Sequence, residues 1–478
     1  MSTSSAYLRH ESPSANIGLL LGLGLFGLAV ALGYAVAVGE VAAFYVALAA
    51  VSAIAVMFDY RIGAILLILL LPMGATYFMP HSVLNIPSLN PFNILLVSTL
   101  FSFMLREKLA GIAPRQLSWM LVAPILVAGL IGAPHAHQIP LVLATQLTFT
   151  DGVGYFREVA VRPLLMVLAV LLVGAAAARS QKPERFLIPI MVAIWILALL
   201  QIGLIVASGV RIGFLATTES RAFYDDMGLH ANDLGRIFSI GYGLLLFVWW
   251  ETKQPALKTA LFLTCGIAAL AMVLSFSRGA FLGFFAINAL FLVWKFNSRT
   301  VGLALLVVAF LAIASPEYLW NRITMGFDSG DPNRVSADRI EGIWLPLLPH
   351  LWDSPIWGSG LGSIMWSLPM LTGGMLPVSH PHSAYLEGLL DMGLLGLGLM
   401  LAYYLHVWRG FRALGSNAYL TPELRAFFQG STAALVCFFI TGWFGSSLRP
   451  DSEFCFLWLA IGMMYGIQRR TRIATATS

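Results

Sequence analysis

Long apolar runs, separated by short polar segments, dominate the chain. A helix that crosses the hydrocarbon core of a membrane needs roughly 20 mostly apolar residues, with about 17 as a lower bound. Runs near this length predict about 14 (roughly 12–14) transmembrane helices and thus an all-α polytopic membrane protein. We place these spans at 17–38, 41–57, 62–78, 91–105, 117–133, 163–178, 186–208, 237–250, 259–277, 280–296, 301–315, 385–408, 427–444 and 454–468.

The composition supports this interpretation. Of the 478 residues, 59% are hydrophobic and 11% are charged, and the mean hydropathy is +0.82. Because a soluble domain typically carries about 25% charged residues, these values exclude that class. We expect a single transmembrane domain over residues 1–478, with no internal repeat. The three cysteines lie inside apolar runs, which argues against a disulfide framework and a thiolate metal site.

The distribution of positive charge predicts the orientation. Cytoplasmic loops of membrane proteins carry an excess of lysine and arginine. With both termini in the cytoplasm, most of the 28 lysines and arginines are cytoplasmic, including every lysine: Lys108, Lys182, Lys253, Lys258 and Lys295. The external cations are then all arginines: Arg157, Arg162, Arg211, Arg221, Arg236, Arg278, Arg322, Arg334, Arg339 and Arg449. Arginine binds phosphate oxygens through two parallel hydrogen bonds, although codon bias and ordinary ion pairs explain the asymmetry equally well.

Two external loops are long enough to carry a site: residues 209–236 and residues 316–384. In the second loop, Ser336 is expected to cap a helix over 337–348. A glycine-rich turn follows, with Gly358, Gly360 and Gly362. We favour a loop that crosses tightly over helix ends there, and a phosphate cradle is the alternative.

Candidate chemistry lies at the membrane boundary. His382 precedes an apolar run, and a neutral imidazole can accept the proton of an attacking hydroxyl, so activity should fall as the pH drops through its titration range. Capping of the helix by His380 or His382 is the structural alternative. The His-Pro-His spacing is not a zinc pattern, so no metal is expected. Arg278 stands at the external end of a span, where an ionisable group either serves a ligand or extends to the interface.

Taken together, these segments resemble the O-antigen ligase and O-antigen (polysaccharide) polymerase superfamily of bacterial inner-membrane glycosyltransferases. The similarity covers about residues 220–410. Family members typically have His-Asn at the last segment, so Ser383 departs from the pattern. The matching pieces are Asn232-Asp233-Leu234, Ser277-Arg278-Gly279-Ala280, Arg339 with Trp344, the glycine-rich turn after Asp353, and the block from His382 through Tyr385 to Gly396.

The resemblance implies an architecture of the GT-C type, which uses lipid-linked donors. A glycan on undecaprenyl diphosphate would pass to a hydroxyl of lipid A core in a ligase, or of a lipid-linked glycan in a polymerase. Arg278 and Arg339 would bind the diphosphate and His382 would activate the acceptor, in a periplasm-facing site that needs no cofactor and binds no nucleic acid. Secondary substrate-binding candidates are Arg236, Arg334, Arg322, Arg221, His380 and Tyr385.

Two other classes of function compete with this one. A lipid-linked oligosaccharide flippase or other transporter has a similar number of spans, but transporters usually place charges near the bilayer midplane and show repeats. A non-catalytic envelope scaffold would leave the grouping of Arg278, Arg339 and His382 unexplained. Pro381 restricts His380 to an extended backbone, so the two histidine rings need not share a direction and His380 should be dispensable.

Overall fold

The computed structural model describes residues 41–477, apart from residues 81, 84–85, 88, 108–113, 141–148, 150, 218, 299, 303–315, 373–375, 377 and 446. The chain forms two compact units: Met1–Gly63 with Met79–Arg106, and Ala64–Phe78 with Glu107–Ser478.

The first unit is built on α2 (Val41–Phe58), the start of α3 (Tyr60–Leu70), and α4 (Pro91–Arg106). The Ser102 hydroxyl of α4 donates to the Val56 carbonyl of α2 (2.7 Å), and the Tyr60 and Phe103 rings meet edge to face. Before α4 the chain makes a small antiparallel pair, β1 (Ser82–Val83) and β2 (Ile86–Pro87).

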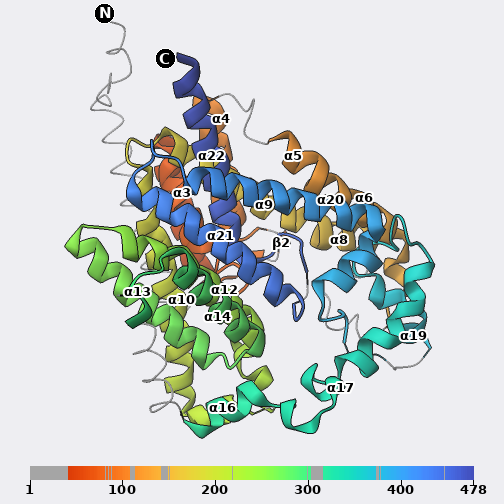
Figure 1. Ribbon diagram of the computed structural model, residues 1–478. Coiled ribbons are helices and arrows are strands. Elements are labelled where there is room, and N and C mark those ends of the chain that lie inside the picture. The colour runs from red at the N-terminus through yellow and green to blue at the C-terminus, as the bar shows by residue number, and fades with distance from the viewer. Residues whose placement is uncertain are drawn as a thin grey trace, which may run out of the picture. The chain divides into compact units, whose positions relative to one another are not determined.

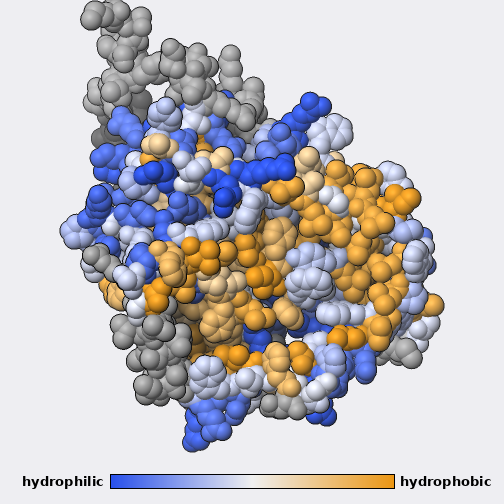
Figure 2. All heavy atoms as spheres, in the orientation of Figure 1, coloured by the Kyte–Doolittle hydropathy of each residue, from blue (hydrophilic) through white to orange (hydrophobic). Residues whose placement is uncertain are grey.

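Six helical segments among the described residues are long and apolar enough to cross a membrane: Arg115–Gln138, Gly152–Arg179, Pro183–Ser208, Pro255–Leu274, Ala384–Gly415 and Pro422–Gly442. Shorter apolar helices cover Leu48–Phe58, Tyr60–Leu70, Pro91–Arg106 and Arg278–Trp294. Figure 2 shows hydrophobic side chains gathered over α6 and α20 (bounds below) on the face in view. The protein is therefore a multi-pass helical membrane protein.

The count of about 14 transmembrane helices stays a prediction. The spans at 17–38 and nearly all of 301–315 lie outside the described residues, whereas the other predicted spans fall on described helices. The span at 62–78 is wrong in its second half, because α3 ends at Leu70 and turns follow. Pro72 disfavours helical backbone at Leu71 and cannot donate a helical hydrogen bond, so the helix stops there.

The elements of the second unit up to α14 follow in chain order. They are α5 (Arg115–Leu117), η1 (Ser118–Val122), α6 (Ala123–Gly132), η2 (Ala133–Gln138), α8 (Gly152–Phe156), η3 (Arg157–Val161), α9 (Arg162–Arg179), η4 (Pro183–Phe186), α10 (Leu187–Ser208), α11 (Ile212–Leu215), η5 (Glu219–Met227), α12 (Ala231–Glu251), α13 (Pro255–Leu274) and α14 (Arg278–Trp294).

The remaining elements include the pieces of the long loop between α14 and α20 (Figure 1). They are α16 (Glu317–Thr324), η6 (Phe327–Ser329), α17 (Pro332–Val335), η7 (Ile340–Trp344), α18 (Leu345–Leu347), η8 (Leu348–Trp352), η9 (Ser363–Trp366), α19 (Leu368–Leu371), α20 (Ala384–Gly415), α21 (Pro422–Gly442), η10 (Ser452–Phe454) and α22 (Cys455–Thr477).

Two helices form the buried centre of the second unit. Helix α12 packs against α13, α14 and α21, and α22 packs against α9. Glycines bring the backbones of α9 and α22 into contact, since a Cβ atom on Gly174 would lie 2.0 Å from the Gly462 carbonyl oxygen. Small residues at such crossings are typical of helix packing in membranes. The N-terminal end of α12 adjoins the segments described next.

Candidate active site

Left-handed backbone marks the segments that the sequence singled out. Among the described residues, the non-glycine residues with positive φ are Phe276 (48°), Ala337 (60°), Asp338 (61°) and His382 (52°). The first lies two residues before Arg278, the next two directly precede Arg339, and the last is His382 itself. Such conformations cost of order 1–3 kcal/mol each and gather where function requires them. Strain therefore accompanies all three predicted site residues.

Helix α14 is fixed at its start by Ser277. Its hydroxyl oxygen accepts from the Ala280 amide (3.4 Å) and its hydroxyl donates to the Asn232 side-chain oxygen (2.9 Å). Gly235 on α12 permits this approach, because a Cβ atom there would lie 2.6 Å from that of Ala280. The Ser-Arg-Gly-Ala motif thus joins α14 to the first turn of α12.

Arg278 follows the cap and is half-buried. Its Nη1 donates to the Met325 carbonyl (2.8 Å), which attaches the long loop to the start of α14. Arg322 is buried beside it, with its Nε donating to the Phe276 carbonyl (3.3 Å). Arg278 thus contacts the long loop through one nitrogen of its guanidinium, whereas Arg322 supports the strained backbone before the cap.

Ser336 caps a helix as predicted, but the helix starts later. Its hydroxyl oxygen accepts from the amides of Arg339 (3.2 Å) and Ile340 (3.3 Å), and η7 begins at Ile340. The predicted start at Ala337 is wrong, because the backbone there and at Asp338 is left-handed. The consequence is that Arg339 occupies the N-cap position of η7.

Arg339 is a half-buried cation with no counter-ion among the residues that the structure describes. Its guanidinium makes no hydrogen bond or ion pair with any residue that the structure describes. Burial, followed by the charges of Arg278 and Arg236, lowers the pKa of the Arg339 guanidinium to about 10. Placing a cation near two others without an acid is unfavourable unless an anion completes the arrangement.

The two histidines of the long loop are in contact. His380 Nε2 lies 3.0 Å from His382 Nδ1, and their ring centroids are 4.0 Å apart. The left-handed backbone at His382 accompanies a close contact of its ring with that of His380 across Pro381, with an interplanar angle of 65° between the rings. Trp344 Nε1 donates to the Pro381 carbonyl (2.8 Å), which joins this loop to the helix that follows Arg339.

Both imidazoles are held neutral. Burial, then the charges of nearby groups including Arg236 and Arg339, lowers the pKa of His380 to about 4. Burial, then His380 and Arg339, lowers the pKa of His382 to about 2. Both rings are therefore neutral across the ordinary histidine range in the ligand-free protein, and the expected pH dependence of activity stays a prediction. A neutral ring is the form that can accept a proton.

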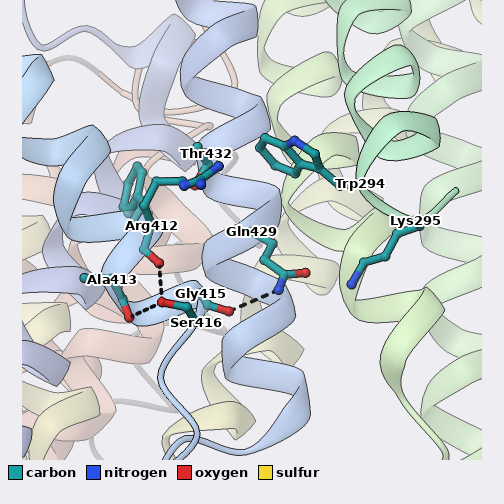
Figure 3. A pocket seen from close by; sticks show the side chains of 9 residues that line it. Trp294, Lys295, Arg412, Ala413, Gly415, Ser416, Gln429 and Thr432 are labelled. Carbon is teal, nitrogen blue, oxygen red and sulfur yellow. Dashed lines mark hydrogen bonds between the residues drawn. The ribbon is translucent and has the colours of Figure 1, made fainter.

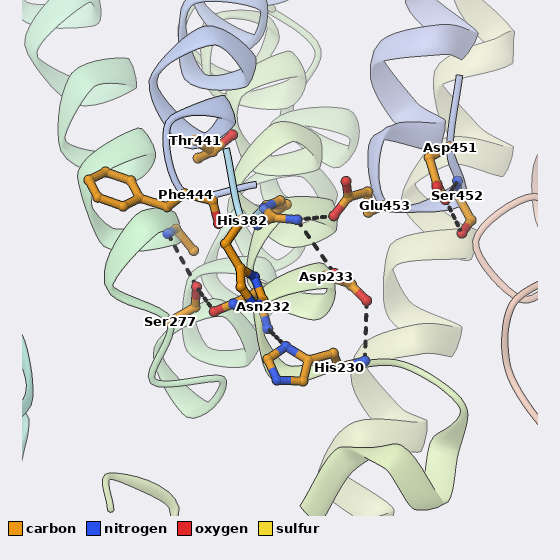
Figure 4. A network of polar contacts seen from close by, with 12 residues as sticks. His230, Asn232, Asp233, Ser277, His382, Thr441, Phe444, Asp451, Ser452 and Glu453 are labelled. Atoms are coloured by element: carbon orange, nitrogen blue, oxygen red, sulfur yellow. Dashed lines mark hydrogen bonds and ion pairs between the residues drawn. The ribbon is translucent and has the colours of Figure 1, made fainter. Parts of the chain in front are cut away.

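His230, which was not among the predicted site residues, contributes to this electrostatic environment. His230 is the N-cap of α12. Its Nδ1 accepts from the Asn232 amide (3.2 Å), and the backbone amide of His230 donates to Asp233 Oδ2 (3.3 Å). Figure 4 shows these contacts beside His382. The local signal was a polar N-cap followed three residues later by an acid, ahead of an apolar run.

Comparison with known families agrees with this arrangement. Residues 260–401 match the sequence model of the family described as O-antigen ligase, and the matched segment contains Arg278, Arg339 and His382. This segment of the chain is similar to the O-antigen ligase family. No curated protein matches the chain. The resemblance stated from the sequence is confirmed, and the family in general comprises membrane glycosyltransferases of the ligase and polymerase type.

Arg236 and Tyr385, like Arg322 and His380, have protein partners. Arg236 on α12 is buried and pairs with Glu453 and, at 3.5 Å, with Asp233, while its Nη2 donates to the Phe444 carbonyl (2.9 Å). Figure 4 shows the two acids beside His382. The Tyr385 hydroxyl donates to the Phe439 carbonyl of α21 (2.7 Å). Protein groups therefore already occupy polar atoms of both side chains.

The other secondary arginines lie farther along the loops. Arg334 is exposed at the end of α17. Arg221 falls in η5, and its side chain lies outside the described part of the chain. In the described residues, no group of three or more His, Cys, Asp or Glu side chains is placed to hold a metal ion.

The glycine-rich turn packs against α20. Gly362 and Ser363 donate their amides to the Asp391 carboxylate (2.8 and 3.0 Å). Gly358 has a φ of 75°, and a Cβ atom there would lie 2.3 Å from the Asp391 carbonyl carbon. The turn crosses tightly over α20 where Gly393 interrupts the helical backbone. Its amides are used by Asp391, which favours the tight-crossing interpretation over a phosphate cradle.

Proposed function

We propose that this protein moves a glycan from undecaprenyl diphosphate to a sugar hydroxyl, at the periplasmic face of the bacterial inner membrane. The single observation that carries the proposal is Arg339: a half-buried guanidinium without a partner among the described residues, electrostatically coupled to Arg278 and His382. A diphosphate supplies the missing negative charge.

The two arginines account for departure of the lipid. In the reaction the bond between the anomeric carbon and the diphosphate oxygen breaks, and undecaprenyl diphosphate leaves with both electrons. Fixed cations that face the developing negative charge lower the barrier, and they need no reorganisation during the reaction. Arg278 and Arg339 provide bidentate donors for this purpose, and arginine remains protonated after partial burial.

His382 then takes the acceptor's proton. In the required tautomer, its Nδ1–H donates to His380 Nε2, which leaves His382 Nε2 as the acceptor site. The hydroxyl oxygen attacks the anomeric carbon opposite the diphosphate and its proton passes to Nε2. One displacement of this kind inverts the anomeric configuration. His380 is a positioning residue that fixes the ring and its tautomer.

Donor binding would also activate this base. The nearby cations contribute to the low pKa of His382 in the free protein. A bound diphosphate neutralises Arg339 and Arg278, so the pKa of His382 rises toward the working pH. A base whose pKa lies nearer the working pH accepts protons more effectively, and here it would do so only once the donor is in place.

The ends of α14 support the proposed orientation. Arg278 is its first residue and Lys295 follows its last, so the site and a lysine lie at opposite ends of one apolar helix. With every lysine of the chain on the cytoplasmic side, the site would face the periplasm. An impermeant thiol reagent should label a cysteine at Ser329 in intact cells and spare one at Lys295; the reverse pattern would overturn the orientation.

Purified protein with a lipid-linked glycan donor tests the function directly. Lipid A core as acceptor should yield a ligated product if the protein is a ligase, and lipid-linked glycan should yield longer chains if it is a polymerase. Transfer to neither acceptor, by protein that binds the donor, would contradict the proposal. Deletion of the gene in cells separates the same two cases. Loss of a ligase should leave lipid A core without an O chain, and loss of a polymerase should leave products with a single repeat.

A further inference from the structure

A second polar site lies at the other ends of α14 and α20. Beyond the interruption at Gly393, α20 continues to Gly415, a length of roughly 33 Å at about 1.5 Å per residue, which is enough to cross a membrane. A pocket of about 460 Å³ lies between the ends of α14 and α20 and the side of α21. Figure 3 shows its lining: Trp294, Lys295, Phe411, Arg412, Ala413, Gly415, Ser416, Gln429 and Thr432.

The pocket carries positive charge only. Lys295 and Arg412 line it, and none of the nine lining residues is acidic. Lys295 Nζ lies 2.6 Å from Glu251 outside the pocket, which uses one of its three protons. The Arg412 guanidinium lies over the Trp294 ring at 5.8 Å and forms no ion pair within the described chain. An anion is the complementary ligand.

Gln429 adds a requirement for a hydrogen-bond donor. Its Nε2 donates to the Gly415 carbonyl (3.0 Å), which fixes the orientation of the amide. Its Oε1 is buried and has no hydrogen-bond partner in the part of the chain that the structure describes. In Figure 3 this oxygen points toward the Lys295 side of the pocket. A buried acceptor without a donor costs about 1–3 kcal/mol, so a ligand that brings a hydroxyl is favoured.

We propose that this pocket binds the headgroup of an anionic phospholipid that carries free hydroxyls, of the phosphatidylglycerol type. The phosphate lies against Arg412 and Lys295, and a glycerol hydroxyl donates to Gln429 Oε1. The ends of membrane-spanning helices lie at headgroup depth, where a tryptophan such as Trp294 is favoured. The volume matches a small ligand. The site is independent of the proposed glycosyl transfer.

Lipid binding to the purified full chain tests the charge requirement. Native mass spectrometry should show more retained phosphatidylglycerol than phosphatidylcholine of the same acyl chains. Arg412→Gln should lower retention of phosphatidylglycerol about tenfold, because the charge-assisted contact is lost. Arg409→Gln is the matched control, since Arg409 is exposed on the same helix and does not line the pocket. Equal loss in both variants, or none in Arg412→Gln, would overturn the site.

Phosphatidylmethanol, which has the same charge and no hydroxyl, tests Gln429. Wild-type protein should prefer phosphatidylglycerol, and Gln429→Leu should bind the two lipids equally. An unchanged preference in Gln429→Leu would contradict the hydroxyl contact. Inorganic phosphate should not compete at millimolar concentration; full displacement would show a site for free phosphate and would overturn the lipid assignment.

Discussion

His380 Nε2 lies 3.0 Å from His382 Nδ1, so one imidazole orients the other. This contact assigns the two rings different tasks. His382 keeps Nε2 for the acceptor hydroxyl, while His380 holds the opposite nitrogen in one tautomer. The left-handed φ of 52° at His382 brings the rings together, and Ser383 then caps α20. Serine and asparagine are both good N-caps, which explains why Ser383 replaces the asparagine typical of the family.

Variants of the two histidines should differ in degree. His382→Ala should abolish transfer while donor binding persists, because the base is removed and the arginines remain. His380→Ala should lower kcat about tenfold or more with little change in KM. His380→Gln should recover part of the lost kcat, because the glutamine oxygen can accept the hydrogen bond from His382 Nδ1–H. Steady-state kinetics on purified protein measure both. His137→Ala, at an exposed site on η2, is the control. An active His382→Ala protein would exclude the base.

Arg339→Lys should lose activity although it keeps the charge, because lysine cannot form the bidentate contact. We expect Arg339→Ala to lower the rate about 100-fold or more, the loss typical of a removed transition-state donor. Arg278→Lys should behave similarly. Arg211→Lys, an exposed arginine at the start of α11, should keep full activity. Full activity of both lysine variants at normal protein levels would show that the bidentate geometry is irrelevant.

Stability should fall below about pH 6.5 because of the histidine pair. In the unfolded chain each imidazole takes up a proton near its ordinary pKa of about 6.5, whereas in the fold the pKa values are about 4 and 2. The unfolded state therefore binds more protons. The histidine pair contributes fully to the free energy of unfolding above pH 6.5, and this contribution declines as the pH falls below 6.5. The melting temperature should drop from pH 7.5 to 5.0. A double His380→Gln/His382→Gln variant should show a smaller drop; an equal drop would refute the assignment.

The left-handed backbone before Arg339 predicts an unusual response to glycine. Ala337→Gly should raise stability by roughly 1 kcal/mol, because glycine tolerates positive φ without the Cβ clash. Ala256→Gly, at an exposed position in α13, should lower it by about 1 kcal/mol through lost helix propensity. Thermal unfolding in detergent compares the two. If both changes destabilise equally, the strain at Ala337 is absent.

Features that depend on local pattern could be predicted from the amino-acid sequence. Apolar run length indicated a polytopic helical protein, because the requirement for roughly 20 apolar residues is set by the bilayer. Short motifs indicated the family and selected Arg278, Arg339 and His382. Ser336 was identified as a cap, because capping depends on neighbouring residues. Pro72 carried the signal that ends α3, although the apolar run through it concealed that boundary.

The polar groups that meet across long stretches of the chain became known from the fold. Arg236 pairs with Glu453 from far along the chain, so its status as a buried, paired side chain could not be predicted from neighbouring residues. The glycine-rich turn packs on Asp391, and His230 joins the environment of the histidine pair. Arg339 is left without an acid among the described residues. Local pattern fixes what a segment is, whereas long-range packing sets the burial and the neighbouring charges that give a side chain its chemistry.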